Sequence, residues 1–233
     1  MKKYDSEELR SDRLQSDLIK DLLAEYSSRT LHLVRHGETD WNARQLFQGQ
    51  KNISLNELGR AQAARIGNRL QNVPLAVIYT SGLKRAQETA QRITEHHELK
   101  VISDPRLNEI SFGDWEGMDF QTIEDRFPDL LDRWFQKPLN TAAPGGESLL
   151  ELSHRVRKSL QEIIPAPAEG EILLVAHGGP LQALICTLLN FPLENYWQFH
   201  LDNASLTTLT MYPEGTVINL LNDTCHLEGL DEG

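Results

Sequence analysis

The sequence predicts an α/β fold, a three-layer sandwich in which helices cover both faces of a mostly parallel central sheet. Short apolar runs typical of buried strands alternate along the chain with longer segments whose apolar residues recur at helical spacing. A chain of 233 residues with 39% hydrophobic content can also bury one sizeable core. We therefore expect one main domain over residues 29–233, preceded by a helical extension over residues 1–28.

Residues 5–27 are predicted to form a charged amphipathic helix, because apolar residues recur there at intervals near one helical turn. The simplest interpretation is a solvated helix packed on the domain. A partner-binding or oligomerisation role, such as formation of a homodimer, is the alternative. The N-terminal residues lack the apolar stretch of a signal peptide, and no run in the chain approaches membrane-spanning length.

The first strand of the domain is predicted over residues 30–35, where the apolar pattern becomes alternating. A loop follows, and then a helix over residues 56–71, for which Ser54 and Glu57 would form a capping box. A second apolar run predicts a strand over residues 75–80. Each strand therefore leads into a helix.

The second helix begins after Ser81 and presents one apolar face. That face comprises Leu83, Ala86, Ala90 and Ile93. Residues 105–146, rich in Trp, Phe, Pro and Gly, are less regular, and a helix over residues 147–164 follows them.

A third strand is expected over residues 171–176, an apolar run that ends in His177 and two glycines before another apolar helix. Two closing strands, near residues 205–212 and 215–221, complete the domain. Because strands alternate with helices, the sheet should be mostly parallel and covered on both faces.

The charge and the cysteine content of the chain limit the classes of function that it can have. A formal net charge of −11 disfavours general binding of nucleic acids or membrane surfaces, because both carry negative charge. Cys186 and Cys225 are too few and too far apart for a disulfide framework, which favours the reducing cytoplasm. The sequence contains no metal-binding spacing and no phosphate-binding glycine loop of the nucleotide-binding type, so we expect neither a metal nor a cofactor.

Polar residues gather at the predicted carboxyl ends of three strands, where ligands bind in open α/β sheets. These residues are Arg35-His36-Gly37, the segment from Ser81 to Arg85, and His177-Gly178-Gly179. A lone histidine is more often a hydrogen-bonded structural residue. Two histidines, each followed by glycine and accompanied by arginines, favour a functional site instead, because glycine lets a ligand approach the ring closely.

This combination suits phosphoryl transfer, which needs a nucleophile, cations for the phosphoryl oxygens and a proton donor for the leaving oxygen. His36 can attack through a neutral ring nitrogen, and Arg35 and Arg85 offer planar donors that match phosphate oxygens. For Arg85 a solvated position on its helix is the competing interpretation. Thr39 and Asn42 could add neutral donors or could instead shape the loop.

The segment R-H-G-E-T-x-x-N at residues 35–42 resembles the signature of the histidine phosphatase superfamily, whose members share the phosphoglycerate mutase-like fold. Further blocks of that family appear in the family's order over residues 31–222. They are L-N-E-L-G at 55–59, S-G-L-K-R-A-Q-E-T-A at 81–90, E-I-S-F-G-D-W-E-G at 109–117, P-G-G-E-S at 144–148 and A-H-G-G at 176–179. A lone R-H-G would be weak evidence, but so many blocks in order are not.

The resemblance implies that His36 is the phosphorylated nucleophile and that Glu109 first protonates the leaving group and then activates water. Arg35, Arg85 and His177 would surround the phosphoryl group. We expect partial burial to raise the pKa of Glu109 towards neutrality, as this role requires. Glu116 is the competing carboxylate in the same stretch.

Within the family, the resemblance favours a phosphatase over a phosphoglycerate mutase. A mutase must exclude water from its pocket, and mutases of the family carry a longer insertion between the acid and the second histidine. Here Glu109 and His177 are 68 residues apart. A third hypothesis is that the chain is a non-catalytic member that binds a phosphorylated ligand. This hypothesis is disfavoured because all five core residues are present.

The substrate-binding rim is predicted from residues 46–52 and 112–140. Gln48 and Gly49 from the first segment, together with Thr39, Asn42 and Gly178, complete the predicted phosphate and substrate contacts. Aromatic residues of the second segment could line an apolar or sugar-binding wall, although packing is the commoner role. The substrate is expected to be a small phosphate ester, and phosphoglycerates, sugar phosphates, α-ribazole phosphate and phosphoserine all remain open. Lys51 is a candidate contact for a second anionic group.

Overall fold

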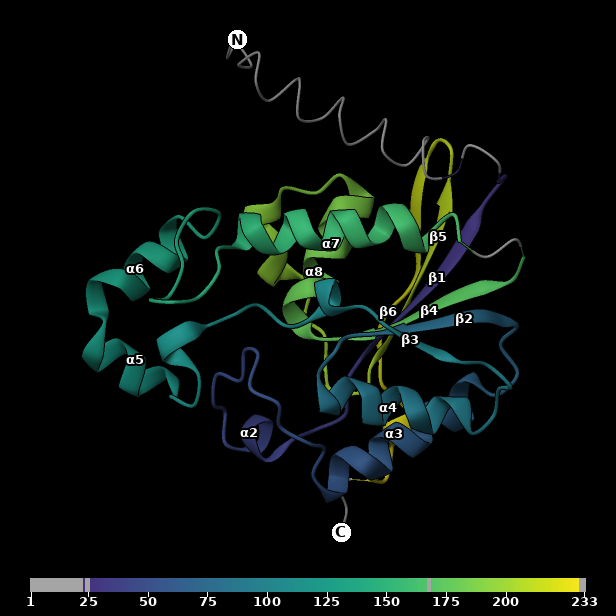
Figure 1. Ribbon diagram of the computed structural model, residues 1–233, viewed down its shortest axis with the longest axis horizontal. Helices are drawn as coiled ribbons and strands as arrows, with labels where there is room; N and C mark the ends of the chain where they lie inside the picture. The colour runs from purple at the N-terminus through teal and green to yellow at the C-terminus, as the bar shows by residue number, and fades with distance from the viewer. Residues whose placement is uncertain (1–22, 24–25, 167–168, 231–233) are drawn as a thin grey trace.

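The computed structural model describes residues 23, 26–166 and 169–230, and it contains one six-stranded sheet in the order β3-β2-β4-β1-β5-β6. The strands are β1 (Arg29–Arg35), β2 (Leu75–Thr80), β3 (Val101–Ser103), β4 (Glu171–Ala176), β5 (Leu206–Tyr212) and β6 (Gly215–Asp223). Helices lie on both sides of this sheet (Figure 1). The predicted three-layer α/β fold is therefore confirmed.

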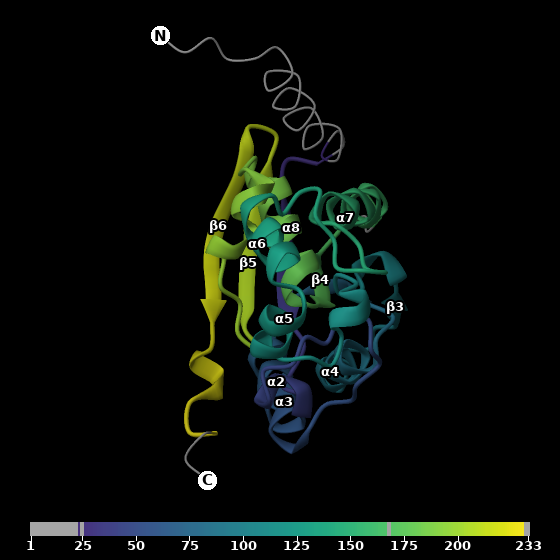
Figure 2. The ribbon, with the colours of Figure 1, turned by 90° about the vertical axis from the view of Figure 1, so that its left-hand side faces the viewer.

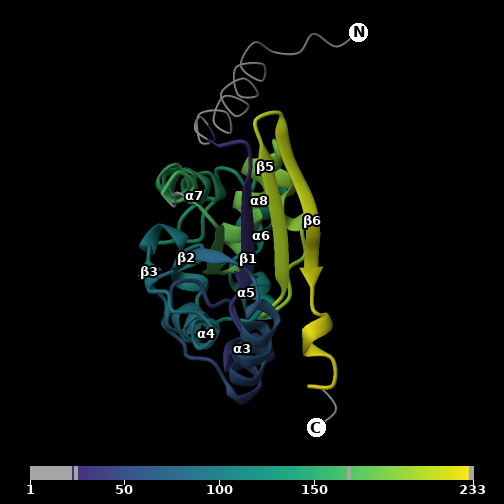
Figure 3. The same ribbon diagram turned by 90° about the vertical axis from the view of Figure 1, so that its right-hand side faces the viewer.

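The sheet is parallel from β3 to β1 and antiparallel at its other edge. β1 pairs in parallel with β4, and β2 pairs in parallel with both β4 and β3. β5 runs antiparallel to β1 and to β6, and the β5–β6 hairpin forms the far edge of the sheet (Figure 3). The register aligns Arg35 with Ala176 and Thr80 with Val175, so that β1, β2 and β4 end side by side.

Two hydrophobic clusters cover the two faces of the sheet. Ile172, Leu174 and Ala176 of β4 pack towards α7 (Leu149–Ile163) and α8 (Gly178–Leu189). The alternate residues of β4, Leu173 and Val175, pack towards α3 (Glu57–Leu70) and α4 (Lys84–Thr94). Successive side chains of a strand point to opposite faces, so an apolar run such as β4 fills both layers.

The start of α3 differs from the prediction. Asn56 is the N-cap, and its side chain accepts a hydrogen bond from the Gly59 amide, so the predicted capping box of Ser54 and Glu57 is wrong. Asn56 directly precedes the helix, and asparagine caps as well as serine does. The Asn56 side chain also donates to the Glu38 carboxylate, which ties the start of α3 to the loop after β1.

The irregular middle segment contains two short helices that the sequence pattern did not predict, α5 (Phe120–Arg126) and α6 (Pro128–Gln136). In Figure 2 they lie in front of the sheet. They pack through an aromatic cluster around Trp115, which is fully buried and contacts the rings of Phe47, Phe127 and Trp134. Packing is therefore the role of Trp115, Phe127 and Trp134, whereas Phe47 also lines the cleft described below.

The helix predicted over residues 5–27 lies outside the described residues, apart from Leu23 and residues 26–27. The division at residue 28 therefore remains a prediction. Among the described helices, none combines the length and the apolar character that crossing a bilayer requires.

Candidate active site

The ends of β1, β2 and β4 bring three polar side chains together. The His36 amide donates to the Ala176 carbonyl at 3.0 Å, and the Ser81 amide donates to the Val175 carbonyl at 3.2 Å. These bonds continue the strand pairing by one residue at each end. His36, Ser81 and His177 therefore lie next to one another where the sheet gives way to loops, and α8 begins directly after His177.

His36 is held in one tautomer. Its Nδ1 lies 2.7 Å from the Gly37 carbonyl oxygen, which can only accept, so Nδ1 carries the hydrogen. Nε2 then keeps its lone pair and accepts a hydrogen bond from Arg85 Nε at 3.2 Å. Burial, followed by the charges of Arg85 and Arg35, lowers the pKa of His36 well below its ordinary value. The ring is neutral and nucleophilic at Nε2.

His177 lies beside His36, with 5.0 Å between the ring centroids. Its Nδ1 accepts a hydrogen bond from Arg85 Nε at 3.1 Å, and its Nε2 lies 2.7 Å from Ser81 Oγ. The neutral ring therefore carries its hydrogen on Nε2 and donates it to the serine. Burial and the Arg85 charge lower the pKa of His177 well below its ordinary value.

Arg85 connects the two histidines to the loop that contains Gly49 and Lys51. It is fully buried, so the competing interpretation of a solvated helix arginine is wrong. Its Nη1 and Nη2 donate to the carbonyls of Lys51 and Gly49 at 2.7 and 2.8 Å. Burial lowers the pKa of Arg85 to about 10, which leaves the guanidinium charged at neutral pH.

Arg35 supplies the second guanidinium. Its Nη1 donates to the Leu201 carbonyl at 2.6 Å. Its Nε is buried and has no hydrogen-bond partner within the part of the chain that the structure describes. A buried donor without a partner is costly, and a bound oxyanion would relieve that cost.

Glu109 brings a carboxyl group to the same place. Oε1 accepts hydrogen bonds from the amides of Ile110 at 2.9 Å and Gly179 at 3.1 Å, the second at the start of α8. Burial raises the pKa of Glu109, and its hydrogen bond to Ile110 and the charges of Arg85, Arg35 and Arg155 oppose the increase. With Oε1 accepting two donors, Oε2 is the atom left to hold a proton.

Glu116, the competing carboxylate, shapes the loop instead. Its Oε1 accepts hydrogen bonds from the amides of Gln50 at 2.8 Å and Phe112 at 3.3 Å. The other oxygen, Oε2, lies 3.8 Å from Lys51 Nζ. Lys51, the candidate contact for a second anionic group, is therefore already paired with a carboxylate.

The predicted site residues surround a cleft of about 270 Å³. The cleft is lined by Arg35, His36, Asn42, Gln45, Leu46, Phe47, Gln48, Gly49, Arg85, Glu109 and Phe112. Three predicted residues do not line it. His177 lies behind its wall, Gly178 lies beside Glu109, and Thr39 is fully buried under the loop.

Thr39 and Asn42 organise the loop after β1. They form a capping box for α2 (Asp40–Ala43), in which each side chain accepts from the backbone amide of the other residue. The Thr39 hydroxyl also lies within hydrogen-bond distance of Asn42 Oδ1 and Gln48 Oε1, at 2.9 and 3.0 Å. The loop-structuring alternative therefore describes Thr39 in this structure, whereas Asn42 both caps α2 and reaches the cleft.

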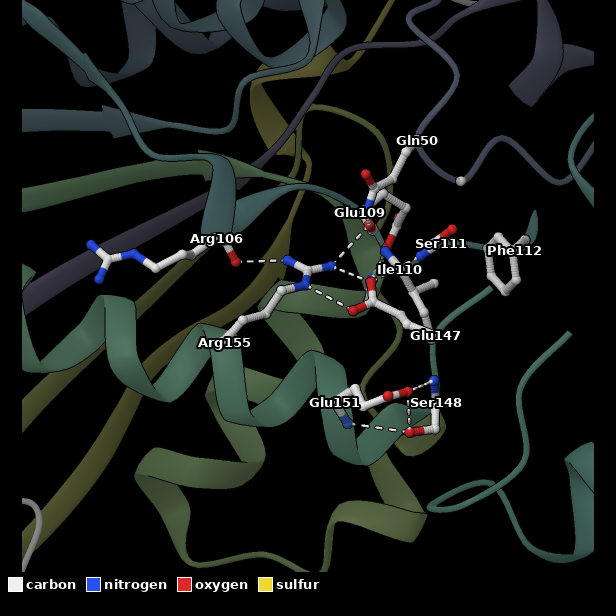
Figure 4. A network of polar contacts seen from close by, with 12 residues as sticks. Gln50, Arg106, Glu109, Ile110, Ser111, Phe112, Glu147, Ser148, Glu151 and Arg155 are labelled. Carbon is white, nitrogen blue, oxygen red and sulfur yellow. Dashed lines mark hydrogen bonds and ion pairs between the residues drawn. The ribbon is translucent and has the colours of Figure 1, made fainter. Parts of the chain in front are cut away.

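Sequence reasoning missed the contacts that hold the site from outside. Asn203 Nδ2 donates to the His36 carbonyl at 3.0 Å, and the Ala204 amide donates to the carbonyls of Arg35 and His36. No local pattern indicates such long-range contacts. Glu147 and Arg155, which hold the segment around Glu109, were also missed, although the P-G-G-E-S block contains the first of them (Figure 4). Among the described residues, no group of His, Cys, Asp and Glu side chains could hold a metal ion.

Comparisons with known proteins show the family of the chain. A profile of the histidine phosphatase superfamily (branch 1) matches residues 31–224. The chain is 38% identical over 197 residues to phosphoserine phosphatase 1 of Hydrogenobacter thermophilus, covering 84% of this chain and 93% of the relative. It is 37% identical to a probable phosphoglycerate mutase of Yersinia enterocolitica, covering 86% of this chain and 96% of the relative.

A solved structure shares the fold. A mycobacterial glucosyl-3-phosphoglycerate phosphatase in complex with VO3 superposes with a TM-score of 0.78 and 33% identity, covering 84% of this chain and 100% of the other. The profile match spans most of the chain and contains both histidines, both arginines and Glu109. The chain belongs to the histidine phosphatase superfamily, branch 1.

Proposed function

We propose that this chain is a metal-independent phosphomonoesterase that hydrolyses a small phosphorylated metabolite through a phosphohistidine intermediate on His36. The tautomer of His36 is the observation that carries the proposal. The hydrogen bond from Nδ1 to the Gly37 carbonyl leaves the lone pair on Nε2, at the side of the ring nearer Arg85 and the cleft. A neutral imidazole nitrogen beside two guanidinium groups is suited to attack a phosphoryl group.

In the first step, His36 Nε2 attacks phosphorus and the bond from phosphorus to the leaving oxygen breaks. Glu109, protonated on Oε2, gives its proton to that oxygen. Arg35 and Arg85 balance the charge on the phosphoryl oxygens, and His177 joins them when it takes up a proton. In the second step, Glu109 accepts a proton from water, which attacks phosphorus and frees His36.

The acid role suits Glu109 because its pKa is raised and because the carboxyl lines the cleft. Two of the relatives above are named as phosphatases, and that supports hydrolysis as the outcome. The relative named as a probable phosphoglycerate mutase supports the alternative, in which a second hydroxyl rather than water takes the phosphoryl group.

A phosphate-release screen over small phosphate esters, run beside a mutase assay, tests the proposal. The panel should include 3-phosphoglycerate and glycerol 3-phosphate, which differ in one carboxylate, together with phosphoserine and sugar phosphates. We expect the wild-type protein to release phosphate from at least one of these esters and His36→Ala to show no turnover. Rapid quenching of the wild-type reaction should trap phosphate on the peptide that contains His36. EDTA should not change the rate. Full activity of His36→Ala would exclude this mechanism.

A further inference from the structure

The segment that carries Glu109 is held by an ion pair outside the cleft. Arg155, on α7, donates from Nε to Glu147 Oε2 at 3.0 Å and from Nη2 to Glu147 Oε1 at 2.6 Å (Figure 4). The side chains of Arg155 and Glu147 are only 20% and 17% exposed. A bidentate arginine–carboxylate pair with little exposure is stronger and more directional than a surface ion pair.

The same guanidinium also donates hydrogen bonds to two backbone carbonyls of the segment that carries Glu109. Nη1 donates to the Arg106 carbonyl at 2.7 Å, and Nη2 donates to the carbonyl of Glu109 itself at 2.9 Å. Four of the five N–H groups of an arginine are thereby used. The backbone position of Glu109 therefore depends directly on Arg155.

Glu147 binds the same segment at Ser111. Its Oε1 accepts from the Ser111 amide at 2.9 Å, and its own amide donates to the Ser111 carbonyl at 2.9 Å. Residues 106–111 are thus fixed at three points by two residues of the α7 region. Ser148 and Glu151 form a capping box that anchors the start of that helix.

We propose that Glu147 and Arg155 are positioning residues for the acid step, because they aim the Glu109 carboxyl at the leaving oxygen. Neither side chain lines the cleft. The proposal rests on the acid role given to Glu109 above. Displacing a catalytic group by about 1 Å can cost up to about 100-fold in rate, even when the mutation lies far from the reacting atoms.

The test uses two substrates of nearly the same shape, 4-nitrophenyl phosphate and phenyl phosphate. Nitrophenolate leaves readily without a proton, whereas phenolate needs one, so the ratio of kcat/KM for phenyl to 4-nitrophenyl phosphate reports on the acid. The kcat/KM value covers only the steps up to departure of the leaving group and is not affected by slow hydrolysis of the phosphoenzyme. We expect Arg155→Lys and Glu147→Gln each to lower this ratio about tenfold or more.

Three controls identify the cause. Glu151→Ala removes only the carboxylate half of the α7 capping box, because Ser148 still accepts from the amide of residue 151, and Lys158→Gln removes an exposed charge from the same helix. Both variants should leave the ratio unchanged. In a Glu109→Gln background, where the acid is already absent, Arg155→Lys should not lower the ratio further. Circular dichroism identifies any variant that does not fold, and the two mild substitutions on opposite sides of the ion pair give two independent chances of a folded one.

The outcomes separate this proposal from the function on which it rests. If Glu109→Gln leaves the ratio unchanged, the acid assignment is wrong. If Glu109→Gln lowers the ratio but both Arg155→Lys and Glu147→Gln keep it, the positioning role is overturned while the acid role stands. An equal loss of rate on both substrates would also overturn it, because that result describes a purely structural pair.

Discussion

Of the two neighbouring hydroxyls at the end of β2, that of Ser81 forms hydrogen bonds and that of Thr80 forms none within the described part of the chain. Ser81 Oγ contacts His177 Nε2 at 2.7 Å and accepts from the Leu83 amide at 3.2 Å. Thr80 Oγ1, equally buried, has no hydrogen-bond partner within residues 23, 26–166 and 169–230. One hydroxyl therefore supports the site, and the other is a buried polar group without compensation.

Substitution of these two residues should have opposite effects. Ser81→Ala leaves the His177 Nε2 hydrogen buried without an acceptor, and we expect it to lower the free energy of unfolding by about 1–3 kcal/mol and to reduce phosphatase activity. Thr80→Val keeps the shape and removes an unpaired hydroxyl, so stability should hold or rise. Urea unfolding curves and turnover with 4-nitrophenyl phosphate measure both effects. Equal losses in the two variants would contradict the assigned contacts.

The pH dependence of the reaction should follow from His36 and Glu109. The pKa of His36 lies well below 6.5, so its lone pair remains available as pH falls through that value, and no loss of kcat/KM there should be due to His36. The pKa of Glu109 is raised above 4.5, and its protonated form is the active acid. For phenyl phosphate, kcat/KM should therefore fall as pH rises through the pKa of Glu109.

Pairs of pH profiles check this prediction. Titration of the substrate affects wild-type protein and Glu109→Gln equally, so the difference between their profiles isolates the carboxyl group. The decrease of kcat/KM with rising pH should be absent in Glu109→Gln. A decrease of the same size in both proteins would assign it to another group.

At the scale of an element, the loop over residues 48–52 takes its shape from side chains that belong to other segments. Arg85 binds the carbonyls of Gly49 and Lys51, and Glu116 binds the Gln50 amide. Gly49 has a φ of +50°, and a Cβ there would lie 2.0 Å from Glu116 Oε1. The close approach of Glu116 therefore requires glycine at position 49.

Removing the Glu116 anchor should weaken substrate binding more than chemistry. Glu116→Ala leaves the Gln50 amide without its acceptor and frees a loop whose residues line the cleft, so KM should rise about tenfold with a smaller change in kcat. Glu116→Gln retains an acceptor oxygen and should stay close to wild type. Steady-state kinetics with 4-nitrophenyl phosphate measures this difference. If Glu116→Gln were as impaired as Glu116→Ala, the charge and not the hydrogen bond would be responsible.

At the scale of the whole molecule, the site joins segments that are distant in sequence. Its histidines and arginines come from the ends of β1 and β4 and from the first turn of α4. A ligand that binds all three segments is held only by the folded chain and so stabilises it. We expect orthovanadate at 100 times its Kd to raise the free energy of unfolding by about 2.7 kcal/mol.

Thermal unfolding with and without vanadate measures that stabilisation. His36→Ala lacks the nitrogen that would bond to vanadium, so it should show a much smaller shift in Tm at the same vanadate concentration. Sodium chloride of equal ionic strength controls for general salt effects. Equal shifts in the two proteins would show that vanadate binds elsewhere.

The sequence predicted those parts of the fold that local signals encode. The expected strands over residues 75–80 and 171–176 coincide with β2 and β4, because buried strands are continuous apolar runs. The three-residue strand β3 and the seven-residue helix α5 were missed, because each is too short to show a period. Helix α6 does have an apolar face, but the Trp-, Phe-, Pro- and Gly-rich segment around it was interpreted as irregular.

The site was predictable only in part, for a similar reason. The alternation of strands and helices predicted a mostly parallel sheet, so His36 and His177 could be expected at the same edge of it, and the observed pairing of β1 with β4 agrees. The contacts of Arg85 with two carbonyls of a distant loop, and of Arg155 with Glu147, depend on the packing of elements far apart in sequence. No spacing along the chain reports such contacts.

The single Arg85 Nε hydrogen, shared between His36 and His177, has a consequence for proton balance. Two ring lone pairs therefore compete for one donor hydrogen. A phosphate dianion bound beside the rings would favour a proton on His177 Nδ1. Ligand capture should then be coupled to proton uptake, and calorimetric binding enthalpies should vary with the ionisation enthalpy of the buffer.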